Sequence, residues 1–168
     1  MMKLIYAPNH MLETPVDKFD FENLNPLAIA EQMIEVMDKH NGVGLAANQV
    51  GLNGQVFVMK PQISMMQPFA VFDPIIRGLS KELEEGEESC LSYPDLVIKV
   101  KRPKSVMIEY TNTAREQKQL KLNDMDARIF LHEYDHLHGI NFVDRISKLK
   151  LDMAVKKSQK RKKLYGRT

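Results

Sequence analysis

The chain has 168 residues, 43% of them hydrophobic, with a single cysteine and a formal net charge of +2. This length fits one domain, and the composition supplies a sizeable apolar core, so a disordered or collagen-like chain is excluded. One cysteine cannot form an intramolecular disulfide, which fits a reducing compartment. The chain contains no run of 18 apolar residues, so no membrane helix is predicted. The N-terminus lacks the sustained apolar stretch of a signal peptide.

The charge is distributed unevenly along the chain. From Arg145 to Thr168 there are ten Lys or Arg and one acid, so this segment carries +9 and the rest of the chain carries −7. A basic tail on an acidic body indicates an acidic partner for the tail, although charge alone fits a solvated terminal helix equally well. We expect residues 1–146 and the tail, residues 147–168, to form a single domain.

Three helices are predicted. The first covers Pro26–His40, because Asn25 can cap it and apolar residues recur at helical spacing. The second covers about Asp124–His138, with Asn123 as its N-cap. The third is the basic segment Ser147–Leu164.

Five short strands are predicted between the first two helices. In chain order they are Gln55–Met59, Ala70–Ile76, Leu96–Val100, Ser105–Tyr110 and Gln117–Leu122. The small-residue segment Gly42–Gly51 is expected to be a loop, and the acidic stretch Lys81–Glu88 is expected to be mostly solvated surface. Strands flanked by separate helices predict an α+β fold, with antiparallel β-sheets around a central helix.

The sharpest motif is H-E-x-x-H at His132, Glu133 and His136. Helical residues four apart share a face, so both imidazoles can reach one metal ion. Glu133 then lies close enough to exchange a proton with water on that ion. Chance would place the motif in about one chain in a hundred of this composition. The alternative is a pair of surface histidines on an amphipathic helix.

A third ligand must come from elsewhere in the chain. Gly139 follows the motif as in metzincins, but Phe142 stands where their third histidine would be, which excludes that pattern. Asp144 and Asp152 stay open as ligands of a thermolysin-like site. Cys90 is the better candidate, because one thiolate and two imidazoles leave a coordination position free for water. The alternative for Cys90 is an inert buried thiol.

Taken together, these motifs resemble the peptide deformylase family, whose members remove the N-formyl group from new proteins. Gly42–Gln49 is similar to the family's G-x-G-φ-A-A-x-Q, and His132–His136 is similar to H-E-φ-D-H. Glu88–Ser92 is similar to E-G-C-φ-S, with Ser89 in place of the glycine. A glycine there can adopt conformations that strain a serine by about 1 kcal/mol. The start of the chain, Ala7–Leu12, also resembles the family, so the resemblance covers nearly the whole chain.

The resemblance implies a metal-dependent hydrolase whose catalytic part is residues 1–146. Cys90, His132 and His136 would bind one divalent ion, natively Fe(II), with Zn(II), Ni(II) or Co(II) able to replace it. Glu133 would take a proton from the attacking water and return it to the leaving amine. The implied reaction cleaves the formamide C–N bond of an N-formyl-methionyl peptide and releases formate.

Further residues receive roles from the same resemblance. The Gln49 side-chain amide and the Leu91 backbone N–H would stabilise the tetrahedral oxygen. Without the resemblance, Gln49 would be interpreted as a loop amide satisfied locally. Gly44 would let the backbone approach an extended peptide substrate. Met125 and Ile129 suit the methionine pocket, with ordinary core packing as the alternative.

Three charged residues surround these positions. Arg128 is expected at the rim of the pocket, with its stem on apolar surface. Glu88 is a candidate acceptor for a metal-bound histidine. Asp135 resembles the family acid that pairs with an arginine, here Arg102, and the alternative is a surface ion pair of little energy.

The resemblance also implies the partners. Deformylases of the bacterial type carry a C-terminal helix that binds near the ribosomal exit tunnel, and the basic tail is similar. We therefore expect nascent chains as substrate, the ribosome as partner, no membrane or DNA partner, and a cytoplasmic location in a bacterium or in the host of a phage. Leu149, Met153 and Leu164 are expected to hold the tail to the body. A solubilising tail is the alternative.

Two other functions stay open. One is a metallo-peptidase that cuts internal peptide bonds. The other is a non-catalytic metal or ribosome-binding module, against which the intact Glu133 argues.

Overall fold

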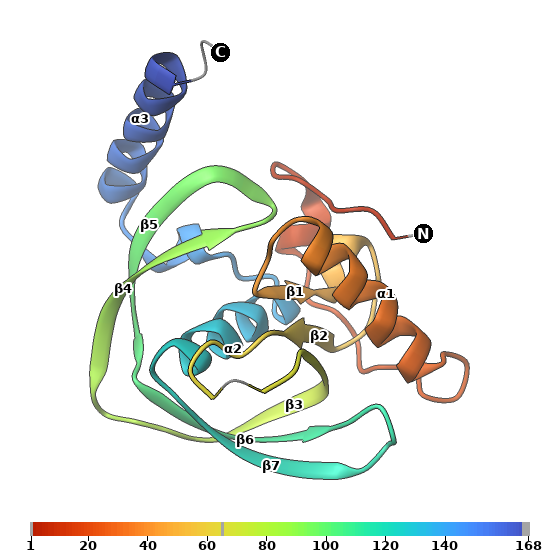
Figure 1. Ribbon diagram of the computed structural model, residues 1–168. Helices are drawn as coiled ribbons and strands as arrows, with labels where there is room; N and C mark the ends of the chain where they lie inside the picture. The colour runs from red at the N-terminus through yellow and green to blue at the C-terminus, as the bar shows by residue number, and fades with distance from the viewer. Residues whose placement is uncertain (1, 65, 166–168) are drawn as a thin grey trace.

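A computed structural model describes residues 2–64 and 66–165 (Figure 1). Within these residues the strands are β1 (Gly44–Ala46), β2 (Val56–Met59), β3 (Phe69–Leu79), β4 (Leu83–Cys90), β5 (Tyr93–Pro103), β6 (Ser105–Thr111) and β7 (Gln117–Asn123). The α-helices are α1 (Pro26–Lys39), α2 (Asp124–Leu137) and α3 (Lys148–Tyr165). Short 3-10 turns lie at η1 (His10–Glu13), η2 (Ala47–Val50) and η3 (Phe142–Arg145).

The strands form two antiparallel sheets, which confirms the predicted α+β class. One sheet has five strands in the order β1-β2-β3-β6-β7, and the other is the pair β4-β5. Figure 1 shows α2 enclosed between these sheets, with α1 against β1 and β2 and with α3 projecting beyond β5. The helix that carries the H-E-x-x-H motif is therefore buried along nearly all of its length.

Both α1 and α2 begin where the sequence predicts, but only the predicted cap of α1 makes its hydrogen bond. Asn25 caps α1, because its side-chain oxygen accepts hydrogen bonds from the backbone N–H groups of Leu27 and Ala28. Asn123 occupies the N-cap position of α2, but its side chain makes no capping hydrogen bond. The predicted side-chain cap is wrong because Asn123 is also the last residue of β7, paired with Ser105, which holds its backbone extended.

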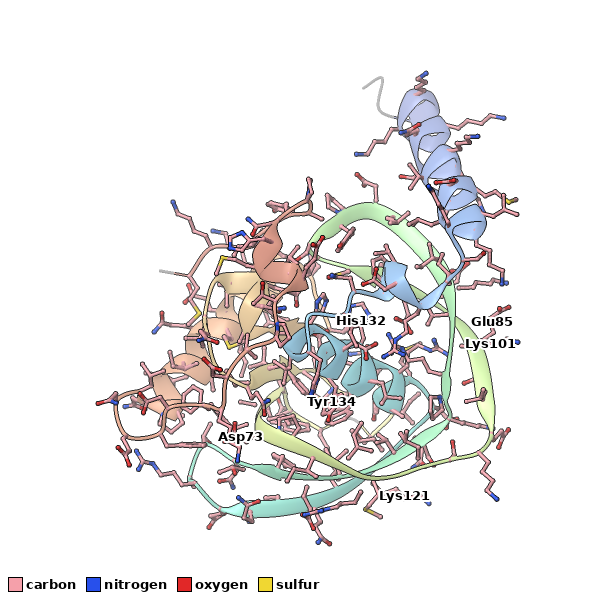
Figure 2. All side chains as sticks on the ribbon, turned by 180° about the vertical axis from the view of Figure 1, so that it is seen from behind. Asp73, Glu85, Lys101, Lys121, His132 and Tyr134 are labelled. Carbon is pink, nitrogen blue, oxygen red and sulfur yellow. The ribbon has the colours of Figure 1, made fainter. Side chains whose placement is uncertain are left out.

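The acidic stretch Lys81–Glu88 is mostly exposed, as expected, with Glu88 as its buried exception. Its expected place outside the strands is wrong. Its larger part is β4, which pairs with β5 over its whole length. Glu85 faces Lys101 across the pair, as Figure 2 shows, and opposite charges in such positions stabilise a sheet. The segment Gly42–Gly51 likewise contains a strand, β1, as well as the η2 turn.

The hydrophobic side chains form two clusters. The larger one lies between α1, α2 and the five-stranded sheet. The smaller one joins β5 to η3 and to α3, and it contains the following buried residues: Cys90, Leu96, Ile98, Val100 and Phe142. The second cluster places one face of Cys90 against apolar side chains beneath the tail.

The face of α3 that packs on the body differs from the predicted one. Leu151, Ala154 and Val155 pack against the smaller cluster. Leu149 is 70% exposed and Met153 is 64% exposed, so neither holds the helix to the body. The spacing of three and four residues from Leu151 to Val155 defines the true apolar stripe. The side chain of Leu164 lies outside the described residues. Of the described helices, none has the length and apolar character needed to cross a membrane.

Candidate active site

Three side chains that can bind a metal meet between β4 and α2. The ligand atoms of Cys90, His132 and His136 all lie within 4.8 Å of one another, and all three residues are buried. The Cys90 Sγ atom is 3.3 Å from Nε2 of His136. Figure 2 shows His132 in the interior of the molecule, on α2. One turn of helix separates the two imidazoles, so the helix alone brings them to the same point.

Cys90 reaches this point because β4 is irregular at its end. The pairing of β4 with β5 shifts register between Ser89 and Cys90. Such an irregularity re-aims the side chain that follows it. The strain expected at Ser89 is absent, because Ser89 is not among the residues with positive φ. The serine in place of the family glycine therefore keeps an ordinary strand conformation.

Glu88 orients the first histidine. The Nδ1 atom of His132 lies 3.0 Å from Oε2 of Glu88, so it donates to the carboxylate and leaves Nε2 for a metal ion. Burial raises the pKa of Glu88, but hydrogen bonds from Arg102 and His132 outweigh burial and lower the pKa to about 2. Glu88 is therefore a charged acceptor at neutral pH.

The pair of Arg102 and Asp135 is buried, which excludes the surface ion pair considered from the sequence. Nη1 of Arg102 donates to Oδ2 of Asp135 at 2.6 Å, and both side chains are less than one-tenth exposed. Nε of Arg145, from η3, donates to the same Asp135 oxygen at 2.9 Å. Arg102 also donates to both oxygens of Glu88. A continuous chain of hydrogen bonds therefore links His132 to Arg145, just before the tail.

Arg128 is not at the rim of the pocket with its stem on apolar surface, as expected. Its side chain is 7% exposed, and its guanidinium points inward, although it still lines the cavity described below. Nη1 donates to Glu88 Oε1 and to the Val100 carbonyl, both at 2.9 Å, and Nη2 donates to the Glu84 carbonyl at 2.8 Å. The buried carboxylate and the strand carbonyls supply acceptors that the sequence pattern did not show.

A cavity of about 520 Å³ opens onto the cluster. Its walls include Cys90 and His132 and six of the other residues assigned to the site: Gly44, Gln49, Leu91, Met125, Ile129 and Glu133. His136 is not part of the wall, because it is fully buried behind Cys90. The structure thus brings together all nine residues that the sequence selected.

Two tyrosines that line the cavity were not predicted from the sequence. Tyr6 comes from the N-terminal segment, and Tyr93 comes from the first position of β5. The N-terminal segment is held there by a backbone hydrogen bond from Ile5 N to the Gln49 carbonyl at 2.8 Å. No local motif marks these residues, because their positions depend on contacts between distant segments.

Glu133 lies beside the cluster in an apolar setting. Its Oε2 atom is buried and has no hydrogen-bond partner among the described residues. Burial raises the pKa of Glu133 to about 7, although the neighbouring His132 and Arg102 act in the opposite direction. A carboxyl group with such a pKa can both accept and return a proton near neutral pH. Gly44 packs directly against this carboxylate.

Gln49 is held on both sides of its amide. Its Oε1 accepts from the Ala46 backbone N–H at 2.8 Å, which is the local hydrogen bond expected of a loop amide. Its Nε2, however, donates to Ser92 Oγ at 3.0 Å and to Cys90 Sγ at 3.3 Å. The amide N–H groups therefore point to the cluster rather than into the loop.

The donor set fits a divalent metal ion. A thiolate and two imidazoles suit Fe, Zn, Ni and Co, and three protein ligands leave a position for water. Burial holds the pKa of His136 well below its ordinary value, so this imidazole is in the neutral form that binds metals. The unpartnered oxygen of Glu133 beside these ligands fits a group that exchanges protons with water.

The chain matches a family model described as polypeptide deformylase over residues 1–152. It is 43% identical over 136 residues to the peptide deformylase of Thermotoga maritima, which is 81% of this chain and 79% of that protein. It is 35% identical over 175 residues to the peptide deformylase of Wolbachia pipientis, which is 98% of both chains.

Solved structures agree with these sequence matches. The peptide deformylase of Synechococcus elongatus in complex with actinonin superposes with a TM-score of 0.86 at 31% identity, over 94% of this chain and 88% of that one. The peptide deformylase of Legionella pneumophila superposes with a TM-score of 0.86 at 27% identity, over 100% of this chain and 99% of that one.

Proposed function

The chain belongs to the peptide deformylase family, and we propose that it removes the N-formyl group from nascent chains with a metal ion held by Cys90, His132 and His136. The observation that carries this mechanism is the convergence of the three ligand atoms beside a cavity whose wall contains Cys90, His132 and Glu133. A bound divalent ion would lower the pKa of water and polarise the formyl carbonyl.

Glu133 is the proton carrier in this mechanism. Its carboxylate accepts a proton from the water that attacks the formyl carbon, and the same oxygen then gives the proton to the leaving amine nitrogen. The buried, unpartnered Oε2 atom supports this role, because it has no competing hydrogen bond among the described residues. General acid–base catalysis of this kind contributes about 10²–10⁴-fold to the rate.

Gln49 and Leu91 provide hydrogen bonds for the tetrahedral oxygen. The Gln49 amide is already aimed at Cys90, and the Leu91 backbone follows Cys90 directly in the cavity wall. Both N–H groups of the Gln49 amide already have partners, so the amide exchanges its bond to Cys90 Sγ or Ser92 Oγ for one to the oxygen when negative charge develops there. Loss of one such donor typically costs about 3 kcal/mol of transition-state stabilisation.

The substrate lies along β1, with its methionine side chain toward α2. β1 is the edge of its sheet, so its outer backbone groups, apart from the Ala46 N–H that donates to Gln49, can pair with an extended peptide. Ile129 is buried and forms a fixed apolar wall, whereas Met125 is 43% exposed and forms the outer part of the pocket. Gly44, at the start of β1, brings this edge close to Glu133.

Fe(II) is proposed as the native metal, with Zn(II), Ni(II) and Co(II) as ions that the same ligands accept. An Fe(II)–thiolate pair is sensitive to oxygen, since thiolates oxidise readily. Metal analysis of protein purified without oxygen tests this, and a predominance of zinc under those conditions would contradict it.

The basic tail is proposed to bind the ribosome, while residues 1–146 carry catalysis within the same domain. α3 packs on the body through one apolar stripe and leaves the lysine side chains described below exposed, with Lys162 paired to Asp95. In the C-terminal half of α3, the described side chains with a basic group are all exposed: Lys156, Lys157, Lys160, Lys162 and Lys163. Such a surface fits the phosphates of ribosomal RNA.

One pair of assays tests the proposed function. Protein loaded with iron or nickel is incubated with formyl-Met-Ala-Ser and, separately, with casein. We expect formate from the tripeptide and no cleavage of casein. Cleavage of casein without deformylation would favour an internal peptidase, and inactivity toward both substrates would favour a binding module.

A further inference from the structure

The metal ligands come from two parts of the fold that share no β-sheet. Cys90 is on β4, and the two histidines are on α2. β4 pairs only with β5, and this pair forms no ladder with the five-stranded sheet on the other side of α2. The distance between the thiolate and the imidazoles therefore depends on side chains that connect α2 with the β4–β5 pair.

Arg128 is such a connection. It belongs to α2, one turn before His132, and its guanidinium donates to the carbonyls of Glu84 on β4 and Val100 on β5. A third, longer contact of 3.4 Å reaches the carbonyl of Gly86. One buried side chain thus fixes both strands relative to the helix.

Arg128 also completes the hydrogen bonds of Glu88. Oε2 of Glu88 accepts from His132 and from Arg102, and Oε1 accepts from Arg102 and from Arg128. The four acceptor positions of the carboxylate are therefore filled, which leaves it one orientation. Arg102 ties Glu88 back to α2 through Asp135, whereas Arg128 ties it to the strand carbonyls.

The chain backbone makes room for this guanidinium. A Cβ at Gly86 would lie 2.8 Å from Cζ and 2.9 Å from Nε of Arg128. Both atoms belong to the mobile end of a side chain, so an alanine at this position would displace the guanidinium without disturbing the strand. Gly86 does not have a positive φ, so its lack of a side chain is explained by this close approach.

We infer that Arg128 is a positioning residue that sets the separation of Cys90 from the two histidines. It touches neither ligand directly and acts through Glu88 and through the carbonyls of β4 and β5. The inference rests on the proposed metal site, because it concerns the geometry of that site. It goes beyond the ligand set by naming a side chain that, together with Arg102, connects the helix of the two histidines to the strand of Cys90.

Titration with Co(II) tests this inference independently of catalysis. The intensity of the thiolate-to-cobalt charge-transfer absorption reports whether Cys90 is a ligand, and the titration gives the Kd. For Arg128→Ala we expect 10–100-fold weaker binding, the usual effect of removing a group that orients a ligand. We also expect a weaker charge-transfer band per bound ion, because Cys90 is no longer held at the proper distance. The Kd of Arg128→Lys should lie between those of wild type and Arg128→Ala, since one ammonium cannot bridge both strands and Glu88.

Gly86→Ala keeps the test valid if Arg128→Ala does not fold. Alone, it should weaken cobalt binding in the same direction as Arg128→Ala. Combined with Arg128→Ala, it should add nothing, because there is no guanidinium left to displace. Ile108→Val, a truncation in the buried core of β6, serves as the control: it lowers stability and should leave the Kd and the spectrum unchanged.

The outcomes are distinct. If wild-type protein shows no thiolate-to-cobalt band, the proposed metal site itself is wrong. If wild type shows the band and Arg128→Ala binds cobalt equally well with the same spectrum, the positioning role is refuted and Arg128 only supports the fold. If the losses of cobalt affinity from Gly86→Ala and Arg128→Ala add up in the double variant, displacement of the Arg128 guanidinium is refuted as the cause of the Gly86→Ala effect.

Discussion

Gly44 and Glu133 occupy adjoining space so closely that any side chain at position 44 would enter the carboxylate. A Cβ built on Gly44 lies 2.3 Å from Oε1 of Glu133 and 2.7 Å from its Cδ. Gly44 is therefore needed to leave room for the Glu133 carboxylate. This is a second reason for a glycine at position 44, beside the approach of the substrate to the backbone.

Gly44→Ala is accordingly expected to move the Glu133 carboxylate and to lower kcat by at least 10²-fold, with the metal retained. Steady-state assays with metal analysis measure both. Gly78→Ala is the matched control, because a Cβ there meets only the Met107 Cβ at 3.9 Å. Equal activity of the two variants would show that Glu133 tolerates the displacement.

Cys90→Ala should release the metal and abolish deformylation, because two imidazoles alone hold a divalent ion weakly. The measurement is metal content per chain after gel filtration. Stoichiometric metal in this variant would remove Cys90 from the ligand set.

Glu133→Gln should keep the metal and lose about 10²–10⁴-fold in kcat, because the amide preserves the shape but cannot accept a proton. Comparison of kcat with metal content separates this result from simple loss of the ion. Turnover close to that of wild type would exclude Glu133 as the proton carrier.

Asp126 should make the stability of the protein depend on pH in the acid range. Burial raises its pKa, but hydrogen bonds from the backbone N–H groups of Ser64, Ile63 and Gln62 outweigh burial and lower it. A group whose pKa is lowered in the folded state stabilises fully above its unfolded pKa of about 3.9. The contribution is lost as the pH falls through the lower, folded value.

Asp126→Asn is therefore expected to lower the free energy of unfolding by about 1–3 kcal/mol at pH 7, with a smaller difference from wild type below about pH 4. Urea unfolding at pH 7, 5, 4 and 3 measures this difference. A difference that is constant over this range would show that the charge of Asp126 contributes nothing.

Neutralising the exposed lysines of α3 should weaken ribosome binding and leave tripeptide activity intact. Gln at positions 156, 157, 160 and 163 keeps the helix and the apolar stripe on the body, whereas removal of the tail would uncover the smaller cluster. Binding to ribosomal RNA should fall with salt by a log–log slope of about −0.7 to −0.9 per phosphate contact. Co-sedimentation across a salt series measures the slope. Unchanged binding of the variant would favour a solubilising tail.

The parts of the site that lie within one element could be predicted from the sequence. The spacing of His132 and His136 is a property of any helix, and the strands with alternating polarity were found with ends displaced by a few residues. Cys90 and Gln49 lie in other segments, and only the combination of three motifs associated them with the histidines.

The parts that depend on pairing between distant segments could not be predicted. β4 carries so many acids that it resembles solvated surface, and only the lysines opposite it on β5 explain its position in a sheet. Arg128 was expected near solvent because an arginine is seldom buried without acceptors. Its acceptors, Glu88 and the strand carbonyls, come together only in the folded chain.

Cys90 is the single cysteine of the chain, so no second cysteine of the same chain can form a disulfide with it. When oxidants convert a thiolate to a sulfenic acid, a second thiol nearby can trap it as a disulfide before it reaches the irreversible sulfinic acid. No such resolving thiol exists within one copy of this chain. Recovery from oxidation at Cys90 must therefore come from small thiols or reductases around the protein, so its working lifetime is set by the redox state of its surroundings.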